Sequence, residues 1–135
     1  MTVVLDVSAA VALLLKKSGR ERFAEVYAEA SWVIAPELYI AELTNMFWKY
    51  CRAGILSRED CGRIAEDGIA LIDQFFGAGD FWKEALGEGM KQGHSVYDLY
   101  YAVLARRYDA SLLTDDGKLG ELCSRMNINT ISAPT

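Results

Sequence analysis

Two short apolar segments of this chain each end in aspartate at the point where a helical pattern begins. The first, TVVLD, covers residues 2–6, and the second, SLLTDD, covers residues 111–116. Short apolar runs of this kind are typical of buried strands in a parallel sheet. Parallel strands present their carboxyl ends at one edge of the sheet, where such sheets bind ligands. Asp6 and the pair Asp115–Asp116 are therefore expected at one crevice.

The rest of the chain alternates strand and helix patterns, which favours an α/β fold with helices on both faces of a parallel sheet. Ser8 is expected to cap the first helix, whose last turn would hold Lys16 and Lys17, and Pro36 is expected in the first turn of a later helix. Strands are predicted at 2–6, 32–35, 111–114 and 128–131, and helices at 9–17, 20–30, 37–52, 57–76, 81–92, 95–108 and 117–127. The sheet is expected to be short, with about four to five strands, and segment 75–82 is a poor strand by pattern.

Length and composition fit a single domain over residues 1–135, with no linker or internal repeat. The formal net charge is −5, so bulk positive charge does not hold nucleic acid, although a divalent cation would reverse the field at an acidic site. Three cysteines without a C-x-x-C pair are typical of core or helix-face residues in a reducing compartment. Neither a signal peptide nor an apolar run long enough for a membrane span is present. A cytoplasmic protein without a membrane segment is expected.

The aspartates that end the strands have a structural interpretation beside a functional one. Asp6 could cap the helix that follows it, although Ser8 competes for that role. Either Asp115 or Asp116 could cap the last helix, which leaves the other aspartate unexplained. Adjacent carboxylates repel each other unless a cation or hydrogen bonds relieve them. A bound metal ion would account for all three positions.

Asp98 has the same two interpretations. It follows Ser95 by three residues, which is the spacing of a capping box at the start of a helix. Ala102 and Ala105 lie below it on the same helix face, where small side chains would leave space around a functional carboxylate.

Glu42 belongs to a narrow polar stripe on an otherwise apolar helix. At 100° per residue the stripe also contains Asn45, Lys49 and Arg52. Such a stripe is either a solvent-exposed face or the lining of a polar cleft.

Acids from two strand ends and two helices could meet at one cleft and form the oxygen-rich site that Mg²⁺ or Mn²⁺ requires. A metal held by carboxylates supports hydrolysis of phosphate esters. His94 is the only histidine, and the chain contains neither G-x-S-x-G nor a glycine-rich phosphate loop. Nucleophilic triads and nucleotide-cradling loops are therefore poorly supported, and His94 is expected to be a structural loop residue.

The chain resembles the PIN-domain ribonucleases, and most closely the small VapC-like toxins of toxin–antitoxin pairs. The resemblance rests on VVLDVSAAVALLL at 3–15, ELYIAELTNMFWK at 37–49 and SVYDLYYAVLARRYDASLLTDDGKL at 95–119. It implies Asp6, Glu42, Asp98 and Asp116 as the catalytic, metal-binding acids, with Ser8, Asn45 and Thr114 as polar support and Asp115 at a variable position. It also implies an endoribonuclease that uses Mg²⁺ or Mn²⁺, forms a homodimer and is inhibited by an antitoxin whose tail enters the cleft.

Two other functions remain open at this stage. One is a Mg²⁺-dependent phosphatase with Asp6 as nucleophile, which would need a second acid where this chain has Ser8. The other is a PIN-like module that binds RNA or a protein without cleaving anything.

Aromatic residues are more numerous than one core is expected to cover. They lie at Phe47, Trp48 and Tyr50, and again at Phe75, Phe76, Phe81 and Trp82. Exposed aromatic surface of this kind predicts an interface, with a second copy or with a partner that presents Arg or Lys to the acidic cleft.

Overall fold

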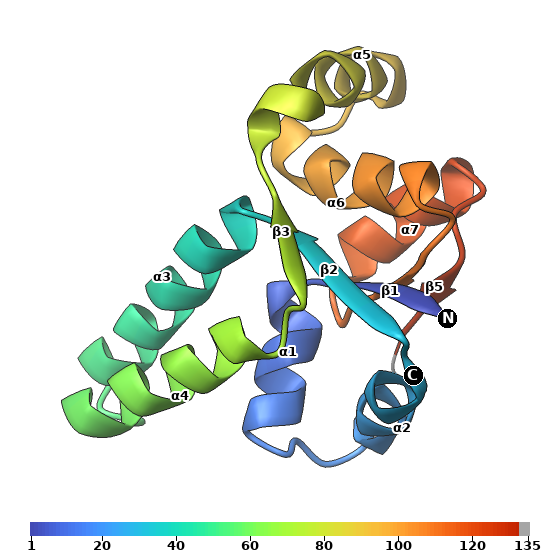
Figure 1. Cartoon of the computed structure of the whole chain (residues 1–135). Helices are drawn as coiled ribbons and strands as arrows, with labels where there is room; N and C mark the ends of the chain where they lie inside the picture. The colour runs from blue at the N-terminus through green and yellow to red at the C-terminus, as the bar shows by residue number, and fades with distance from the viewer. Residues whose placement is uncertain (133–135) are drawn as a thin grey trace.

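The computed structural model describes residues 1–132, and residues 133–135 of the expected domain lie outside the described residues. Within that range the chain forms a five-stranded, wholly parallel sheet in the order β3-β2-β1-β4-β5 (Figure 1). The strands are β1 (Thr2–Leu5), β2 (Trp32–Pro36), β3 (Gln74–Phe76), β4 (Ser111–Leu113) and β5 (Thr130–Ile131). The expected α/β fold is confirmed.

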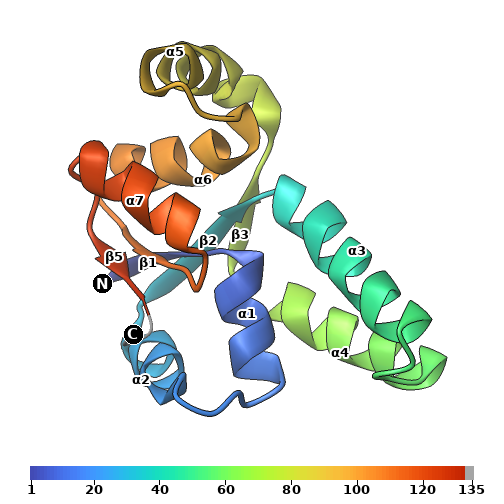
Figure 2. The same ribbon diagram turned by 180° about the vertical axis from the view of Figure 1, so that it is seen from behind.

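Helices cover both faces of this sheet. They are α1 (Val7–Leu14), α2 (Glu21–Glu29), α3 (Leu38–Arg52), α4 (Arg58–Ala70), α5 (Trp82–Gln92), α6 (Val96–Arg107) and α7 (Gly117–Arg125), with a short 3₁₀ turn η1 (Ala78–Asp80). α1 and α2 lie on one side and α6 and α7 on the other, with α5 packed outside α6 (Figures 1 and 2). No helix within residues 1–132 has the length and apolar character that a bilayer crossing requires.

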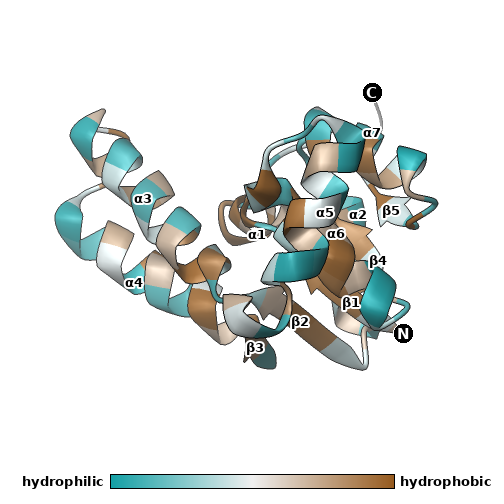
Figure 3. Cartoon of the chain, turned by 90° about the horizontal axis from the view of Figure 1, so that it is seen from above, coloured by the Kyte–Doolittle hydropathy of each residue, from teal (hydrophilic) through white to brown (hydrophobic). Residues whose placement is uncertain are grey.

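The core lies between the central strands and the inner faces of the helices. Val3, Val4 and Leu5 of β1 are completely buried, because helices cover both faces of the strand. Figure 3 shows hydrophobic residues along β1 and β2 and hydrophilic ones at the far end of the α3–α4 pair. Cys61 and Cys123 are buried and Cys51 is half-buried, as expected for core or helix-face residues, and all three are free thiols.

α3 and α4 form a helical pair that projects away from the sheet (Figures 1 and 2). The pair is close because α4 carries Gly68, where an added Cβ would lie only 2.7 Å from the Leu43 side chain. The hydroxyl of buried Tyr39 donates to the backbone oxygen of Gly68 at 2.7 Å. The α3–α4 contact therefore fixes the direction of α3 and of the polar stripe that begins at Glu42.

The helix predicted from Ser57 to Phe76 is wrong at its C-terminal end, over residues 71–76. Ser57 caps α4 as expected, but the helix ends at Ala70 and Gln74–Phe76 forms the edge strand β3. The local sequence pattern does not mark this segment as a strand, because long-range contacts, and not local periodicity, stabilise it. The Asp73 backbone N–H donates to the Val33 oxygen at 2.7 Å, and the Val33 N–H donates to the Asp73 carboxylate at 2.7 Å. Both bonds bring the segment alongside β2.

Three smaller predictions near helix starts and ends are also wrong. Asp6, and not Ser8, caps α1, which begins two residues earlier than expected. Lys16 and Lys17 follow the helix instead of occupying its last turn, because Lys16 adopts a positive φ of 50°. Pro36 ends β2, pairs with Phe76 and precedes α3. Pro is compatible with that position because it is the last residue of β2, beyond the end of the β1–β2 ladder, and it pairs only with β3.

The predicted aromatic surface is only partly exposed. Phe47 and Phe81 are buried in the core, and Phe76 packs edge-on against Trp32 and Phe81. Trp48 and Trp82 are about half exposed, at 56% and 48%. The excess of aromatic residues therefore supplies core packing at the sheet edge as well as exposed surface.

Candidate active site

Asp6 lies at the carboxyl end of β1, where it caps α1 and keeps only 5% of its surface exposed. Its Oδ1 accepts hydrogen bonds from the Ala9 backbone N–H at 2.9 Å and from the Ser8 hydroxyl at 2.7 Å, and Oδ2 accepts one from the Thr114 hydroxyl. Burial raises the pKa of Asp6 to about 6, and these hydrogen bonds oppose the rise. The structural and functional interpretations of Asp6 are compatible, because one carboxylate caps the helix and lines the pocket.

The hydroxyls of Ser8 and Thr114 join the ends of β1 and β4. Each accepts a backbone hydrogen bond from the segment after β4: Ser8 from the Asp115 N–H at 2.8 Å, and Thr114 from the Asp116 N–H at 3.0 Å. Both hydroxyls also donate to Asp6. The turn that carries the two aspartates is therefore tied to the carboxylate of β1.

Asp115 and Asp116 have different partners. Asp116 caps α7, and its Oδ1 accepts from the Lys118 backbone N–H at 2.9 Å. Both oxygens of Asp115 accept from Nε of Arg20, each at 3.1 Å. The repulsion expected between adjacent carboxylates is thus relieved by a cap on one side and an arginine on the other. Only Asp116 lines the pocket described below.

Glu42 projects from α3 and meets Tyr101 of α6. The Tyr101 hydroxyl donates to Oε1 of Glu42 at 2.6 Å. Burial raises the pKa of Glu42, the Tyr101 hydrogen bond lowers it, and the negative charges of Asp98 and Asp116 raise it further. Burial also raises the pKa of Tyr101, so the phenol stays neutral and acts as a donor.

Asp98 occupies the first turn of α6. Ser95 precedes the helix but makes no side-chain capping hydrogen bond, so the capping-box interpretation is not supported. The Asp98 carboxylate lies 3.5 Å from Nε2 of His94, and Ala102 and Ala105 are fully buried on the same helix. Burial raises the pKa of Asp98, and the charge of Asp116 adds to the rise.

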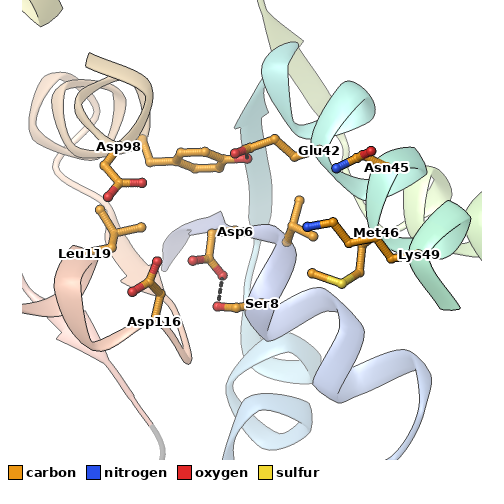
Figure 4. Close-up of a pocket in the computed structure, with 11 residues that line it drawn as sticks. Asp6, Ser8, Glu42, Asn45, Met46, Lys49, Asp98, Asp116 and Leu119 are labelled. Carbon is orange, nitrogen blue, oxygen red and sulfur yellow. Dashed lines mark hydrogen bonds between the residues drawn. The ribbon is translucent and has the colours of Figure 1, made fainter. Parts of the chain in front are cut away.

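These carboxylates line one pocket of about 250 Å³. Figure 4 shows Asp6, Asp98 and Asp116 on one side and the α3 side chains, from Glu42 to Lys49, on the other. The lining consists of Asp6, Val7, Ser8, Glu42, Asn45, Met46, Lys49, Asp98, Tyr101, Asp116 and Leu119. Acids far apart in the sequence therefore share one concave surface at the carboxyl ends of the strands.

The structure brings most of the predicted site residues to this pocket. The residues in the lining are Asp6, Ser8, Glu42, Asn45, Asp98 and Asp116. Thr114 is completely buried behind Asp6, and Asp115 turns away to Arg20. Sequence reasoning missed Tyr101 and the contact of His94 with Asp98. Tyr101 could have been found, because it follows Asp98 by three residues and so shares its helix face.

The chemistry of this donor set fits a hard divalent cation. The acids supply only oxygen ligands. Burial and nearby negative charge raise the pKa of Asp6, Glu42 and Asp98, so the charged forms of these three are unfavourable without a cation. No three His, Cys, Asp or Glu side chains within residues 1–132 form a ready metal-binding group. Mg²⁺ keeps several waters and takes few protein carboxylates, so an open arrangement of acids is compatible with it.

Comparisons with known proteins concern the family and the fold of this chain. A family model described as PIN domain matches residues 3–124. Ribonuclease VapC3 of Pyrobaculum aerophilum is 29% identical over 127 residues, which cover 90% of this chain and 94% of that protein.

Two solved structures show the same fold at low sequence identity. The crystal structure of PAE2754 from Pyrobaculum aerophilum has a TM-score of 0.75 at 19% identity, covering 98% of this chain and 89% of that one. VapBC2 from Rickettsia felis, bound to a DNA fragment from their promoter, has a TM-score of 0.70 at 17% identity, covering 99% of this chain and 100% of the matched chain.

Proposed function

This chain belongs to the PIN-domain family, and we propose that it is a Mg²⁺- or Mn²⁺-dependent endoribonuclease, the toxin of a toxin–antitoxin pair. The observation that carries the proposal is that Asp6, Glu42, Asp98 and Asp116, from four separate segments, line one pocket. The relative named Ribonuclease VapC3, similar over almost the whole chain, supports RNA as the substrate. The protein is proposed to act in the cytoplasm.

The four acids are proposed to hold the metal ion. When bound, the ion supplies Lewis-acid activation of water and neutralises charge on the phosphodiester. Asp6 is kept in one rotamer by Ser8, Thr114 and the Ala9 N–H, so its position does not depend on the ion. Tyr101 holds Glu42 from the opposite side of the pocket.

The phosphatase alternative has less support. Both oxygens of Asp6 accept hydrogen bonds within the protein, and its side chain is nearly buried. Ser8, at the position where that chemistry would need an acid, instead donates to Asp6.

A homodimer and an antitoxin are the proposed protein partners. Trp82, Leu86 and Met90 follow one face of α5 at intervals of four residues, and all three are exposed. Exposed Tyr97 follows at the start of α6. An apolar stripe of this kind is typical of an interface, and we assign it to a second copy. The neighbour VapBC2 supports an antitoxin as the other partner.

Cleavage of single-stranded RNA in Mg²⁺ or Mn²⁺, with loss in EDTA and recovery when the ion is returned, is the test of the proposed activity. A phosphatase would instead release phosphate from a monoester and leave the RNA chain intact. RNA binding without cleavage in either metal would identify a non-catalytic module. Co-expression with the product of the adjacent reading frame tests the toxin proposal, because an antitoxin should co-purify, block cleavage and compete with Mn²⁺.

A further inference from the structure

Lys49 is a basic side chain in an acidic pocket that the proposed metal chemistry does not use. It is the one lysine or arginine among the described lining residues, beside the four acids. It follows Glu42 by seven residues and Asn45 by four, so all three lie on the same face of α3. Figure 4 shows its amino group extending along the pocket toward the side of Asp6.

No carboxylate of the described residues lies within ion-pair distance of the Lys49 amino group. None of the ion pairs found within residues 1–132 includes it. The acids have other partners: Asp6 binds Ser8 and Thr114, Glu42 binds Tyr101, Asp98 lies beside His94, and Asp116 caps α7. The ammonium group is therefore available to an anion that enters the pocket.

The anion that this position suits is a phosphate of a nucleic-acid strand. With a net charge of −5 and four acids in the lining, the pocket repels a polyanion wherever no cation lies nearby. Seven residues of helix separate Lys49 from Glu42 by about 10 Å along the α3 axis. Lys49 therefore leaves α3 about two turns beyond Glu42, which places it for a neighbouring phosphate, whereas the acids surround the position of the scissile one. Asn45, between them on the same face, can donate its side-chain amide to the same strand.

We propose that Lys49 is a substrate-positioning residue that binds a phosphate flanking the scissile phosphodiester of single-stranded RNA. The inference rests on the proposed ribonuclease function. Lys49 supplies a point charge on a flexible stem, which is a common way of holding a phosphate without fixing its base. It neither holds the metal nor transfers a proton.

The test compares wild type with Lys49→Met, Lys49→Arg and the control Lys91→Met, which removes the same charge from the exposed end of α5. The substrate is a single-stranded RNA oligonucleotide that wild type cleaves in Mn²⁺. For Lys49→Met we expect KM to rise about tenfold with kcat within about twofold, because one charge-assisted contact is lost in ground and transition states alike. The slope of log KM against log salt should fall by roughly 0.7. Lys49→Arg should restore both values, and Lys91→Met should match wild type.

A second substrate locates the phosphate. Neutral methylphosphonate linkages, placed one at a time on either side of the cleavage site, should raise KM for wild type at one position, and that position should have no further effect in Lys49→Met. The rise in melting temperature on adding Mn²⁺ should be equal in both proteins. If Lys49→Met left KM and the salt slope unchanged, or lowered only kcat, the proposed role of Lys49 would be wrong, although wild type would still cleave RNA. Absence of any cleavage by wild type would remove both proposals.

Discussion

The hydroxyl of Tyr101 on α6 donates a 2.6 Å hydrogen bond to the carboxylate of Glu42 on α3. This bond joins the helix beside the central strands to the helix that projects away from the sheet. Glu42 therefore reaches the pocket with a fixed orientation, although α3 packs mainly against α4. The position of one acid relative to the other three depends on this contact.

Tyr101→Phe should reduce RNA cleavage about tenfold, because it removes one hydrogen bond to a charged group. The pKa of Glu42 should rise further, since the Tyr101 hydrogen bond lowers it. Stability should change by no more than about 1 kcal/mol, because Glu42 is only half-buried and water can replace the phenol. Tyr97→Phe on the same helix, where the hydroxyl is exposed, is the matched control. Equal activity of both variants would show that Tyr101 does not position Glu42.

The sequence predicted the elements that carry the site better than the contacts that complete it. Strand ends at Asp6 and Thr114 are visible because short apolar runs stop at polar residues, and the fold then places those ends together. Tyr101 and Arg20 were not assigned partners, because their contacts join segments 59 and 95 residues apart. The strand Gln74–Phe76 was missed for the same reason, since Asp73 and β2 hold it in place and no local periodicity marks it.

Asp98→Asn should abolish cleavage and leave the metal-free protein equally or slightly more stable. Burial and the charge of Asp116 raise the pKa of Asp98, so its charged form is unfavourable without a metal ion. A capping role predicts the opposite pattern, with activity kept and a small loss of stability. Cleavage rate and melting temperature in EDTA, measured on the same samples, separate the two. Asp80→Asn, in the surface turn η1, controls for the loss of one negative charge.

Asp116 and Asp115 should respond differently to substitution. Asp116→Asn should lose cleavage and keep its stability, since Asn is as good a helix cap as Asp, whereas Asp116→Ala should also lose about 1 kcal/mol of stability. Asp115→Ala breaks the partly exposed pair with Arg20, which should lower stability by less than about 1 kcal/mol and preserve cleavage. Cleavage assays and urea unfolding of the three variants test this. The reverse order of activity would assign Asp115 to the site.

In EDTA the free energy of unfolding should fall as pH rises from 5 to 7.5. The pKa of Asp6 is about 6 in the folded protein against an ordinary 3.8, so the folded state binds more protons through this window. The contribution of Asp6 should be about 1–1.5 kcal/mol over that range, and Glu42 and Asp98 act in the same direction. Glu84 and Glu88 have lowered pKa values, so their stabilising effect is already complete at pH 5. In urea unfolding, the stability of Asp6→Asn should depend less steeply on pH than that of wild type. Parallel profiles would contradict a raised pKa of the buried Asp6 carboxylate.

Leu86→Glu should convert the proposed dimer into a monomer without unfolding it. Leu86 lies at the centre of the exposed stripe on α5, between Trp82 and Met90, so a charge there would be buried in an interface but solvated in a free subunit. Gel filtration with light scattering gives the mass, and the melting temperature at low protein concentration reports the fold. Lys91→Glu places the same acid on α5 outside the stripe and should leave the mass unchanged. If wild type is already monomeric at high concentration, the stripe has another occupant, and loss of antitoxin binding in Leu86→Glu would then identify it.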